Sequence, residues 1–376
     1  MIKTSCLFIA SLFFVFNLLA QHQVTFRVTK VPEYQPAGST LYIAGSFNNW
    51  NPKHADYQFR KNENHFILTV SLPAGKHEFK LTRGGWNAGE TAKEGASLAN
   101  RIINVTDDIE VELAVEDWAD HFDATPVKST ANAQVKILDS AFYIPQLNRT
   151  RRVWIYLPLN YETSGKKYPV LYMHDGQNVF DDASSYSGEW GVDEALDSLA
   201  AGCREIIVVA IDNGGDKRMN EYSPYDMERF GKGEGDAYAE FLVKTLMPYI
   251  NKHYPASRKR KDQFIAGSSM GGLISLYTVL KYPRSFGAAG IFSPAFWVAP
   301  GIEKAVKDKG KKVRTRLYFH AGMLEGEQMV PDMLSIFESM NAVSHAEMTS
   351  VIRAEGRHHE SAWRKEFPMF YCWMID

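Results

Sequence analysis

The stretch 262–277, DQFIAGSSMGGLISLY, holds a short apolar run, a G-x-S-x-G pentapeptide centred on Ser269, and a second apolar run at helical spacing. Phe264–Ala266 predict a buried strand and Leu273–Tyr277 predict the helix after it, so Ser269 is expected on a strand-to-helix turn. Glycines on both sides allow a tight turn, because no Cβ atom obstructs the neighbouring backbone. At the helix N-terminus the backbone N–H of Met270 can receive an oxyanion. The stretch predicts a nucleophilic serine; a Gly/Ser-rich loop arisen by chance is the alternative.

Length and composition bound the number of domains and exclude one class of partner. A chain of 376 residues exceeds a comfortable single core, so two domains are expected. Apolar residues make up 45% and charged residues 23%, which is ordinary for a globular protein. A formal net charge of −2 gives no electrostatic reason for binding nucleic acid, and we expect no such partner.

Residues 1–20 have the pattern of a secretory signal peptide. Lys3 provides a positive charge, Leu7–Leu19 is almost wholly apolar, and Ala20 offers a small residue at the cleavage point. The apolar run is too short for a comfortable membrane span, and no later segment approaches 18 apolar residues. We therefore expect a secreted or periplasmic protein with no integral membrane segment after cleavage. An uncleaved N-terminal anchor is the alternative.

Two cysteines, Cys203 and Cys372, remain after the predicted signal peptide. Two cysteines permit one disulfide, but sequence alone does not place them within bonding distance. We expect two buried thiols, because a domain of this size does not need a covalent staple.

Residues 21–115 alternate apolar and polar side chains in short runs separated by glycine-, asparagine- and proline-containing turns. The expected strands are residues 40–44, 65–72, 77–82 and 109–115. Strands at this spacing predict a small all-β sandwich of immunoglobulin type. Residues 116–134 are polar and small and include Pro126, so they are expected to be the linker.

Within this region, GSFNNW at 45–50, Leu72–Gly75 and Glu78–Lys80 resemble the starch- and glycogen-binding modules, including carbohydrate-binding module family 48 and the glycogen-binding domain of a eukaryotic kinase β-subunit. In those modules two tryptophans, a lysine and an asparagine form the sugar platform. An aromatic face stacks on a pyranose ring, while ammonium and amide groups hydrogen-bond its hydroxyls. A packing module with partly buried tryptophans is the alternative. The resemblance assigns the platform to Trp50, Lys80, Trp86 and Asn100.

From residue 135 onward, predicted strands and helices alternate. Continuous apolar strands such as IIVVAI at 206–211 suit a sheet covered on both faces. We therefore expect an α/β-hydrolase domain over residues 135–376 with a mainly parallel, doubly wound sheet. The expected strands are 153–157, 170–173, 206–211, 264–266, 288–292, 317–320 and 348–352, and the expected helices are 190–201, 237–251, 273–280, 302–309, 329–341 and 360–373.

A serine nucleophile needs a base to accept its proton and an acid to orient that base. In the α/β-hydrolase arrangement the acid and then the histidine follow the serine, each on a loop after a later strand. Glu325 follows one predicted strand, and His358 and His359 follow the last one. The chain order Ser269, Glu325, His358 is the one that this fold requires. The alternatives are Glu327 or Asp332 as the acid and His359 as the base.

The second domain resembles the esterase family that gathers iron–enterobactin (enterochelin) esterases, S-formylglutathione hydrolase, and the feruloyl and acetylxylan esterases of carbohydrate esterase family 1. The matching segments, in chain order, are YMHDGQNVF at 172–180, GSSMGG at 267–272, Gly322-x-x-Glu325-Gly326 and Gly356-x-His358-x-Glu360-x-x-Trp363. The resemblance implies that Ser269 is the nucleophile, His358 the base and Glu325 the acid.

The same resemblance implies an oxyanion hole made by the backbone N–H of Met270 and that of Gln177, with Gly176 next to it. Asp175 stands between His174 and Gly176, where the family has His-Gly, and this departure leaves the exact donor open. His174 is expected to end a buried strand and to brace the loop.

Asp212, Glu221 and Tyr222 lie on a long glycine-containing connection, where such folds build substrate pockets, and they are expected to contact substrate. The alternative is that Glu221 pairs with Arg218 or holds the loop. The sequence contains no metal-ligand set of recognised spacing and no dinucleotide or P-loop glycine pattern, so we expect no metal and no cofactor.

Together these patterns predict a secreted serine carboxylic-ester hydrolase that works through an acyl-enzyme. Its expected substrate is a carbohydrate-linked ester, such as a feruloyl or acetyl group on a plant polysaccharide or oligosaccharide. A siderophore esterase opening a catecholate trilactone is one alternative, which basic residues in the pocket would favour. A non-catalytic glycan-binding protein on a hydrolase scaffold is the other, and an intact set of serine, acid and histidine argues against it. Oligomeric state does not follow from the sequence.

Overall fold

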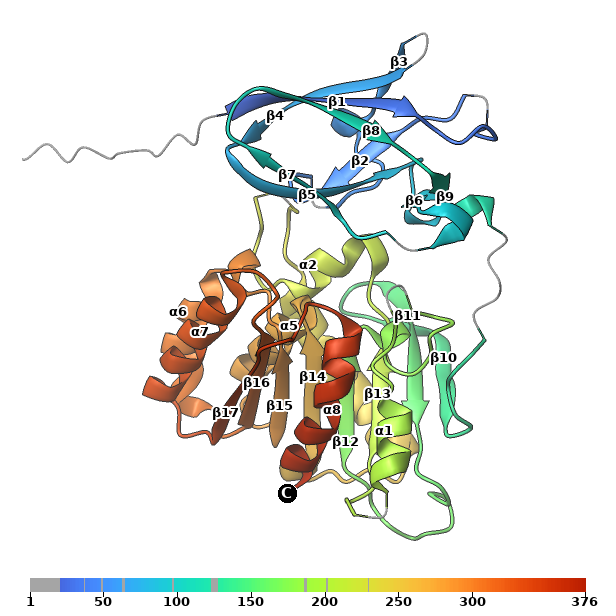
Figure 1. Cartoon of the computed structure of the whole chain (residues 1–376). Coiled ribbons are helices and arrows are strands. Elements are labelled where there is room, and N and C mark those ends of the chain that lie inside the picture. The colour runs from blue at the N-terminus through green and yellow to red at the C-terminus, as the bar shows by residue number, and fades with distance from the viewer. Residues whose placement is uncertain are drawn as a thin grey trace, which may run out of the picture. The chain divides into compact units, whose positions relative to one another are not determined.

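The computed structural model describes residues 21–376 except 37, 49, 63, 64, 97, 123–127, 186, 187, 201 and 229. The predicted signal peptide, residues 1–20, lies outside the described residues. The chain divides into two compact units, one up to residue 126 and one from residue 127 onward (Figure 1). Among the described helices, none combines the length and the apolar character needed to cross a bilayer.

The main part of the first unit is formed by two small β-sheets that share one apolar core. One sheet has the order β3-β4-β1-β8, and the other has the order β2-β5-β7. Phe26, Ile43 and Phe79 come from strands of both sheets and are buried in the same core. The strand bounds are β1 (Gln21–Lys30), β2 (Tyr42–Gly45), β3 (Arg60–Asn62), β4 (His65–Pro73), β5 (Gly75–Thr82), β7 (Arg101–Val105) and β8 (Ile109–Ala114).

The first unit continues into the segment that was predicted as linker. β9 (Asp117–Trp118) pairs with β6 (Glu90–Thr91), and the side chain of Trp118 is completely buried. Its indole nitrogen donates a hydrogen bond to Gln35 Oε1 at 3.1 Å. The prediction of a linker over 116–134 therefore begins too early, because one aromatic side chain in a polar run is enough to anchor that run to the core.

The predicted linker also ends too late. Ser129 Oγ and the Thr130 backbone N–H donate to the carboxylate of Asp181 at 2.9 and 3.2 Å. The Asn132 backbone N–H donates to Asp193 at 2.8 Å. These residues are therefore fastened to the second unit.

The second unit is built on an eight-stranded sheet of order β10-β11-β13-β12-β14-β15-β16-β17. β13, β12, β14, β15, β16 and β17 run parallel to one another. β10 and β11 pair antiparallel at one edge, and β11 is antiparallel to β13, so the sheet is mixed. The bounds are β10 (Val135–Ile144), β11 (Arg149–Tyr156), β12 (Val170–His174), β13 (Ile207–Ile211), β14 (Gln263–Ser268), β15 (Ala288–Phe292), β16 (Arg316–Gly322) and β17 (Met348–Arg353).

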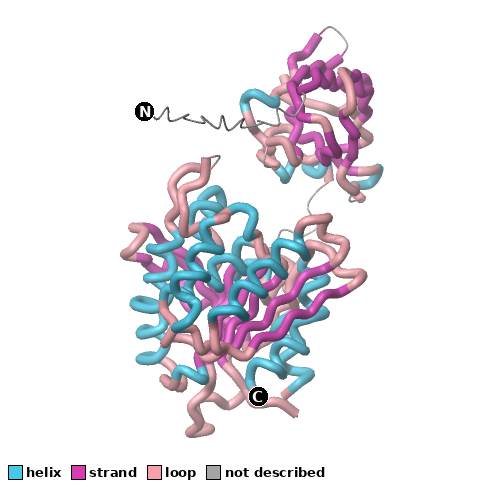
Figure 2. The backbone as a smooth tube through the Cα atoms, turned by 90° about the vertical axis from the view of Figure 1, so that its left-hand side faces the viewer, coloured by secondary structure: helices cyan, strands magenta, loops and turns pink. Residues whose placement is uncertain are grey.

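Helices cover both faces of this sheet (Figures 1 and 2). Along β11, Val153 and Ile155 enter one apolar core, while Trp154 and Tyr156 enter the other. The first core also receives side chains from α3 (Gly235–Phe241), α4 (Met247–His253), α5 (Met270–Lys281), α6 (Gly301–Lys309) and α7 (Met329–Val343). The second core is covered by α1 (Val192–Leu199) and α8 (Glu360–Ile375).

The two cysteines differ from the expectation of buried thiols. Cys203 and Cys372 are both half-buried, and no disulfide joins them. Their sulfur atoms lie 3.2 Å apart.

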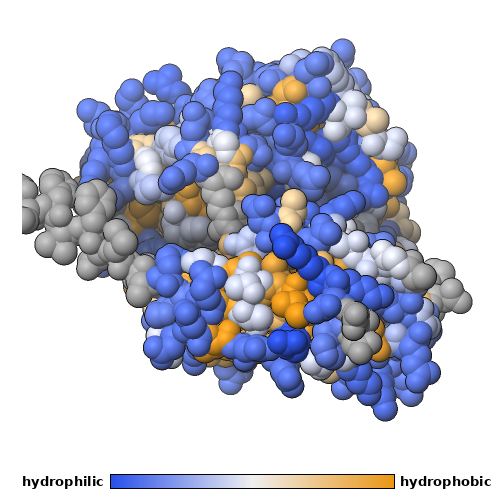
Figure 3. Space-filling model, turned by 90° about the horizontal axis from the view of Figure 1, so that it is seen from above, coloured by the Kyte–Doolittle hydropathy of each residue, from blue (hydrophilic) through white to orange (hydrophobic). Residues whose placement is uncertain are grey.

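The outer surface is mainly hydrophilic in the view from above Figure 1, with smaller apolar areas among the polar side chains (Figure 3). Large apolar side chains that are exposed include Trp86 in the first unit, at 46% exposure, and Trp297 in the second, at 65%.

Candidate active site

Ser269 occupies the turn between β14 and α5. Its backbone has φ 58° and ψ −120°, a conformation that residues other than glycine avoid. The Ser269 N–H donates to Phe292 O at 2.9 Å, and its carbonyl oxygen accepts from the Ala295 N–H at 3.0 Å. These two hydrogen bonds to the segment around the end of β15 hold the strained residue in place. Met270 is the first residue of α5, so its backbone N–H belongs to the helix N-terminus.

Two glycines beside the serine allow the turn to pack closely. A Cβ atom on Gly267 would lie 2.8 Å from His174 Cδ2, and one on Gly271 would lie 3.2 Å from His174 Cβ. His174 ends β12, and its Nδ1 lies 3.0 Å from the Tyr238 hydroxyl oxygen. Burial lowers the pKa of His174 to about 4, so the ring is neutral at physiological pH. As predicted, His174 ends a buried strand; its side chain packs against the glycines of the Ser269 turn.

Glu325 and His358 form a hydrogen-bonded pair. His358 Nδ1 lies 2.8 Å from Glu325 Oε2; the glutamate side chain is fully buried and the histidine side chain is 38% exposed. Burial raises the pKa of Glu325, but hydrogen bonds from His358 and Ser293 outweigh burial and hold that pKa below its usual value. The glutamate is therefore ionised and orients the ring, which leaves Nε2 as the nitrogen that can accept a proton.

The loops that carry this pair touch backbone to backbone. A Cβ atom on Gly322 would lie 2.3 Å from the carbonyl carbon of Gly356, and the Leu324 N–H donates to Gly356 O at 2.9 Å. The backbones of Gly322 and Gly356 can lie this close because neither residue has a Cβ atom. The glycines of the two motifs therefore set the distance between the acid and the histidine.

Ser293 supports the glutamate from the other side, and sequence reasoning missed it. Its hydroxyl donates to Glu325 Oε1 at 2.7 Å and accepts from the indole N–H of Trp363 at 2.9 Å. The Trp363 ring also meets His358 edge to face, with ring centroids 5.2 Å apart. Ser293 directly follows β15, the strand next to that of Ser269, and this position is the signal that could have identified it.

The alternative acids and base lie elsewhere. Glu327 is exposed, and Asp332 lies in the first turn of α7; among the described residues neither carboxylate is bonded to a histidine. His359 instead caps α8, since its Nδ1 accepts the backbone N–H of Ser361 at 3.1 Å. The geometry therefore favours Glu325 and His358.

The loop after β12 carries the candidate oxyanion donor, Gln177. A Cβ atom on Gly176 would lie 2.8 Å from backbone atoms of β13 and of Asp212, so this loop presses directly on the neighbouring chain. The side-chain oxygen of Gln177 accepts the Asn213 N–H at 3.1 Å, and its buried Nε2 has no hydrogen-bond partner among the described residues. Gln177 therefore keeps an unused donor at the same edge of the sheet as Ser269.

The inserted Asp175 is anchored inside the protein. Arg218 donates to its two oxygens at 2.7 and 2.8 Å, and Asn213 Nδ2 donates at 2.8 Å. Burial raises the pKa of Asp175, but Arg218 outweighs it and holds the pKa below its usual value. The insertion thus fixes the loop through a buried ion pair.

Of the three residues that were expected to contact substrate, Glu221 and Tyr222 are completely buried, which corrects the prediction for these two, whereas Asp212 is partly exposed. Glu221 is completely buried and pairs with Arg149 and Arg151 at 2.9 and 2.6 Å, rather than with Arg218. Tyr222 is completely buried against Tyr238. Asp212 accepts from Arg152 Nε and from Trp154 Nε1, each at 2.8 Å. The connection is held by charge pairs that sequence spacing alone did not reveal.

In the first unit the two tryptophans of the predicted sugar platform are neighbours. The rings of Trp50 and Trp86 lie 6.3 Å apart, centroid to centroid, at 39°. Lys80 lies on β5, and Asn100 directly precedes β7, which pairs with β5 up to Phe79 and Arg101. Asn100 Nδ2 donates to Glu78 Oε2 at 3.1 Å.

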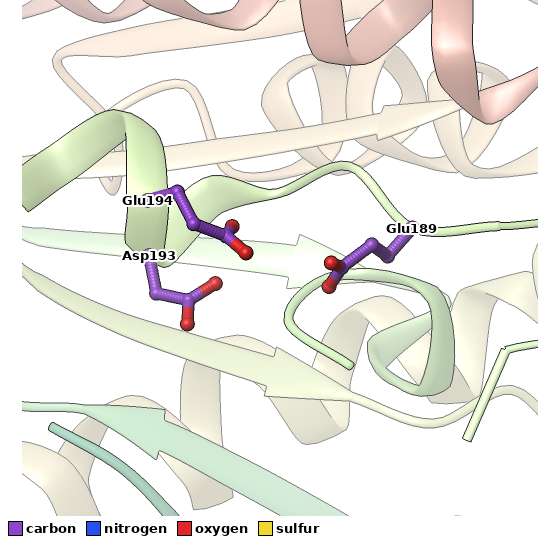
Figure 4. A group of neighbouring side chains, drawn as sticks. All are labelled: Glu189, Asp193 and Glu194. Carbon is purple, nitrogen blue, oxygen red and sulfur yellow. The ribbon is translucent and has the colours of Figure 1, made fainter. Parts of the chain in front are cut away.

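Among the described residues, one group of three carboxylates has the spacing of a cation site. Figure 4 shows Asp193 and Glu194, on the first turn of α1, pointing toward Glu189 on the preceding loop; one oxygen from each lies within 4.8 Å of the others. Burial raises the pKa of both Glu189 and Asp193 to about 7. The Arg364 guanidinium lies 3.5 Å from Glu189 and 3.7 Å from Glu194. Protons and this guanidinium are thus available to offset the negative charge.

Relatives of similar sequence include a bacterial protein that matches most of its own length and an esterase that matches in part. The uncharacterized protein YbbA of Bacillus subtilis is 25% identical over 241 residues, which span 60% of this chain and 92% of YbbA. The endo-1,4-beta-xylanase/feruloyl esterase of Xylanibacter ruminicola is 27% identical over 175 residues, which span 44% of this chain and 23% of that protein.

The fold is shared with the enterobactin esterase FES from Shigella flexneri, crystallised in the presence of enterobactin. The two structures align with a TM-score of 0.53 and 16% identity, over 94% of this chain and 92% of that one. The model of the glycogen recognition site of AMP-activated protein kinase matches residues 28–111. The Esterase family model matches residues 144–372, more than half of the chain, and the protein belongs to the Esterase family.

Proposed function

We propose that this esterase is a serine carboxylic-ester hydrolase of the α/β-hydrolase type, with Ser269 as nucleophile, His358 as base and Glu325 as acid. The observation that carries the proposal is the 2.8 Å hydrogen bond between His358 Nδ1 and the buried Glu325. The two residues stand on loops after β16 and β17, and Ser269 stands after β14 in the same parallel set. The carboxyl ends of parallel strands meet at one edge of a sheet, where such sites form.

The reaction begins when His358 Nε2 takes the proton of the Ser269 hydroxyl as Oγ attacks the ester carbonyl carbon. The backbone N–H groups of Met270 and Gln177 stabilise the oxyanion that forms. The bond to the alcohol oxygen then breaks, and His358 returns the proton to the departing alcohol. Water attacks the acyl-enzyme by the same route, releasing the acid and restoring Ser269. Ionised Glu325 stabilises the protonated ring in both halves.

Three single variants test the assignment with p-nitrophenyl acetate and methyl ferulate. Ser269→Ala and His358→Ala should each lower kcat by about 10⁴-fold or more, and Glu325→Gln by about 10³-fold. The neighbours His359→Ala and Glu327→Gln are matched controls and should keep kcat within about threefold of the wild type. Full activity in Ser269→Ala would overturn the proposal and leave a non-catalytic protein as the better account.

A carbohydrate-linked ester is the proposed substrate, and secretion is the proposed route by which the protein reaches it. The match of residues 28–111 to a glycogen-recognition model and the paired rings of Trp50 and Trp86 support a sugar-binding role for the first unit. The name of the Xylanibacter ruminicola relative supports a feruloyl ester in particular. The signal-peptide pattern of residues 1–20 supports export.

Binding and cleavage can be tested separately on the full chain. Affinity electrophoresis in starch and in xylan should show retardation that Trp86→Ala removes and Trp297→Ala keeps. Release of ferulate from feruloylated arabinoxylan oligosaccharides, or of acetate from acetylated xylan, should depend on Ser269. Retention on neither polysaccharide would reduce the first unit to a structural module, and absence of ester cleavage on both substrates would reject the carbohydrate-ester proposal.

A siderophore ester is the second candidate. A surface cavity of about 620 Å³ lies beside the His358 loop, and its lining includes Arg353, Arg357 and Lys365. Arg353 pairs with Glu366 at 2.6 Å, so the remaining charged groups of the lining are Arg357, Lys365 and the opposing carboxylate of Glu355. The two cations would have to outweigh Glu355 to attract an anionic ligand such as an iron–catecholate complex. Hydrolysis of ferric enterobactin at a kcat/KM above that of the feruloylated oligosaccharide would favour this candidate.

A further inference from the structure

Cys203 and Cys372 are neighbours in space although 169 positions separate them in the sequence. Their Sγ atoms lie 3.2 Å apart, and both side chains are half-buried, so an oxidant can reach them. Cys203 follows α1 and Cys372 lies in the last turns of α8, the two helices that cover the same face of the sheet.

The chain on both sides of the pair is held in place. The Cys203 N–H donates to Leu199 O at 3.0 Å, which ties the residue to the end of α1. The Tyr371 hydroxyl, next to Cys372, donates to the carbonyl oxygen of Arg204, next to Cys203. The two sulfur atoms are therefore kept close by contacts other than their own.

We propose that Cys203 and Cys372 form an intrachain disulfide when the protein meets a disulfide oxidant, such as a thiol–disulfide oxidoreductase or glutathione disulfide. A disulfide has an S–S distance of about 2.05 Å, so the sulfur atoms must approach by about 1.1 Å from the separation in the reduced form. We expect rotation of the two cysteine side chains to supply a movement of this size.

The oxidation proceeds by two exchange steps. The Cys203 thiolate attacks one sulfur of the oxidant disulfide, and the other sulfur of the oxidant leaves as a thiolate. Cys372 then loses its proton and attacks Cys203 Sγ, which expels the first oxidant sulfur. Two protons and two electrons pass to the oxidant, which ends as two thiols. Burial raises the pKa of Cys372 to about 11, so at neutral pH this thiol is protonated and must give up its proton in the second exchange.

Such a bond closes a long loop and anchors the C-terminal end of α8. Cross-linking distant residues restricts the unfolded chain, so the bond should stabilise the fold. Trp363, which contacts His358, lies in the first turn of α8. Cys372 lies about two and a half turns further along the same helix. We therefore expect a large effect on resistance to heat and a small one on kcat.

Peptide mapping of the full chain tests the bond. The protein is incubated with glutathione disulfide, alkylated with N-ethylmaleimide under denaturing conditions, and digested without reductant. A peptide pair linked through Cys203 and Cys372 is expected, with neither cysteine alkylated; prior dithiothreitol should give one maleimide on each. Alkylation of both cysteines after glutathione disulfide would overturn the proposal. Because each peptide is read separately, Cys6 in the predicted signal peptide does not affect the result.

Thermal unfolding provides the second readout. Dithiothreitol should lower the Tm of the oxidised protein by about 5 °C or more. Cys203→Ala, Cys372→Ala and the double variant should not respond to the reductant, whereas Ser198→Ala, an exposed position on the same helix end, should respond as the wild type does. A wild-type Tm that is the same with and without dithiothreitol would contradict the bond.

Discussion

At the scale of single residues, the backbone of Ser269 is strained at the turn between β14 and α5. A positive φ at a residue with a Cβ atom costs about 1–3 kcal/mol, and the hydrogen bonds to Phe292 and Ala295 maintain it. We predict that Ser269→Gly is more stable than Ser269→Ala by about 1 kcal/mol, because both lack the hydroxyl but only glycine relieves the strain. Urea unfolding of the two variants measures the difference. An alanine variant as stable as the glycine variant would show that the turn is unstrained.

Ser293 offers a second prediction at this scale. Ser293→Ala removes one hydrogen bond to the ionised Glu325 and leaves the Trp363 indole without an acceptor. A hydrogen bond to a charged group contributes about 1.5–3 kcal/mol, so kcat on p-nitrophenyl acetate should fall at least tenfold with KM nearly unchanged. Ser293→Thr keeps a hydroxyl and should restore part of the rate. A Ser293→Ala variant with wild-type kcat would mean that Glu325 is held without it.

The buried carboxyls beside α1 predict a dependence of stability on pH. The pKa of Glu189 and of Asp193 is about 7 in the folded protein, against about 4 in the unfolded chain. The folded state therefore binds more protons between these values, and stability should fall as the pH rises from about 4 to about 7, with the loss complete above pH 7. Asp193→Asn should raise the Tm at pH 8 and change it little at pH 4.

The exposed Asp216 provides the control for that experiment, because Asp216→Asn should leave the Tm unchanged at both pH values. An Asp193→Asn variant that is less stable than the wild type at pH 8 would contradict the assignment of a destabilising charge. It would point instead to a stabilising role for the ionised carboxylate.

At the scale of elements, the contact between the Gly322 and Gly356 loops controls the geometry of the acid and the base. Gly322→Ala should force the loops apart and lower kcat/KM on p-nitrophenyl acetate by about tenfold or more, because small displacements of catalytic groups are costly. Gly202→Ala adds a methyl group where nothing lies within 4 Å and serves as the control. Wild-type kcat/KM in Gly322→Ala would show that the loops tolerate separation.

Most elements could be predicted from the sequence because their apolar pattern is regular. The strand at 288–292 and the helix at 302–309 match β15 and α6 within one residue, and the predicted helix at 237–251 is divided between α3 and α4 by a π-helical turn. β10 was missed, since its ten residues are mostly exposed and show no clear alternation. The antiparallel direction of β11 was also missed, because strand direction depends on pairing partners that are distant in sequence.

In the candidate site, too, residues that follow a local sequence pattern could be predicted, whereas residues whose roles depend on distant partners could not. Ser269, Glu325 and His358 could be predicted as candidates because each follows a recognisable strand in a fixed order. Ser293 was missed, and Glu221 was taken for a substrate contact, because their roles depend on partners such as Trp363 and Arg151 that only the folded chain brings near. Spacing in the sequence predicts loops; it does not predict ion pairs across a sheet.

At the scale of the whole molecule, we expect the first unit to determine binding to polysaccharide and the second unit to determine hydrolysis of small esters. Trp86→Ala should weaken retention on polysaccharide and leave kcat/KM on p-nitrophenyl acetate unchanged, since this small ester makes no use of a sugar platform. Activity on an insoluble feruloylated polysaccharide should fall in proportion to the lost binding. Equal loss on the small ester would mean that the tryptophan supports the fold rather than a glycan.

The central claim is that Ser269, activated by His358, attacks the ester. Mass-spectrometric mapping of the adduct formed with a fluorophosphonate, a reagent that modifies activated serines, tests it most directly. We predict a single adduct on Ser269 in the wild type and in His359→Ala, and no adduct in His358→Ala. An adduct on another serine, or labelling of Ser269 that does not require His358, would contradict the account.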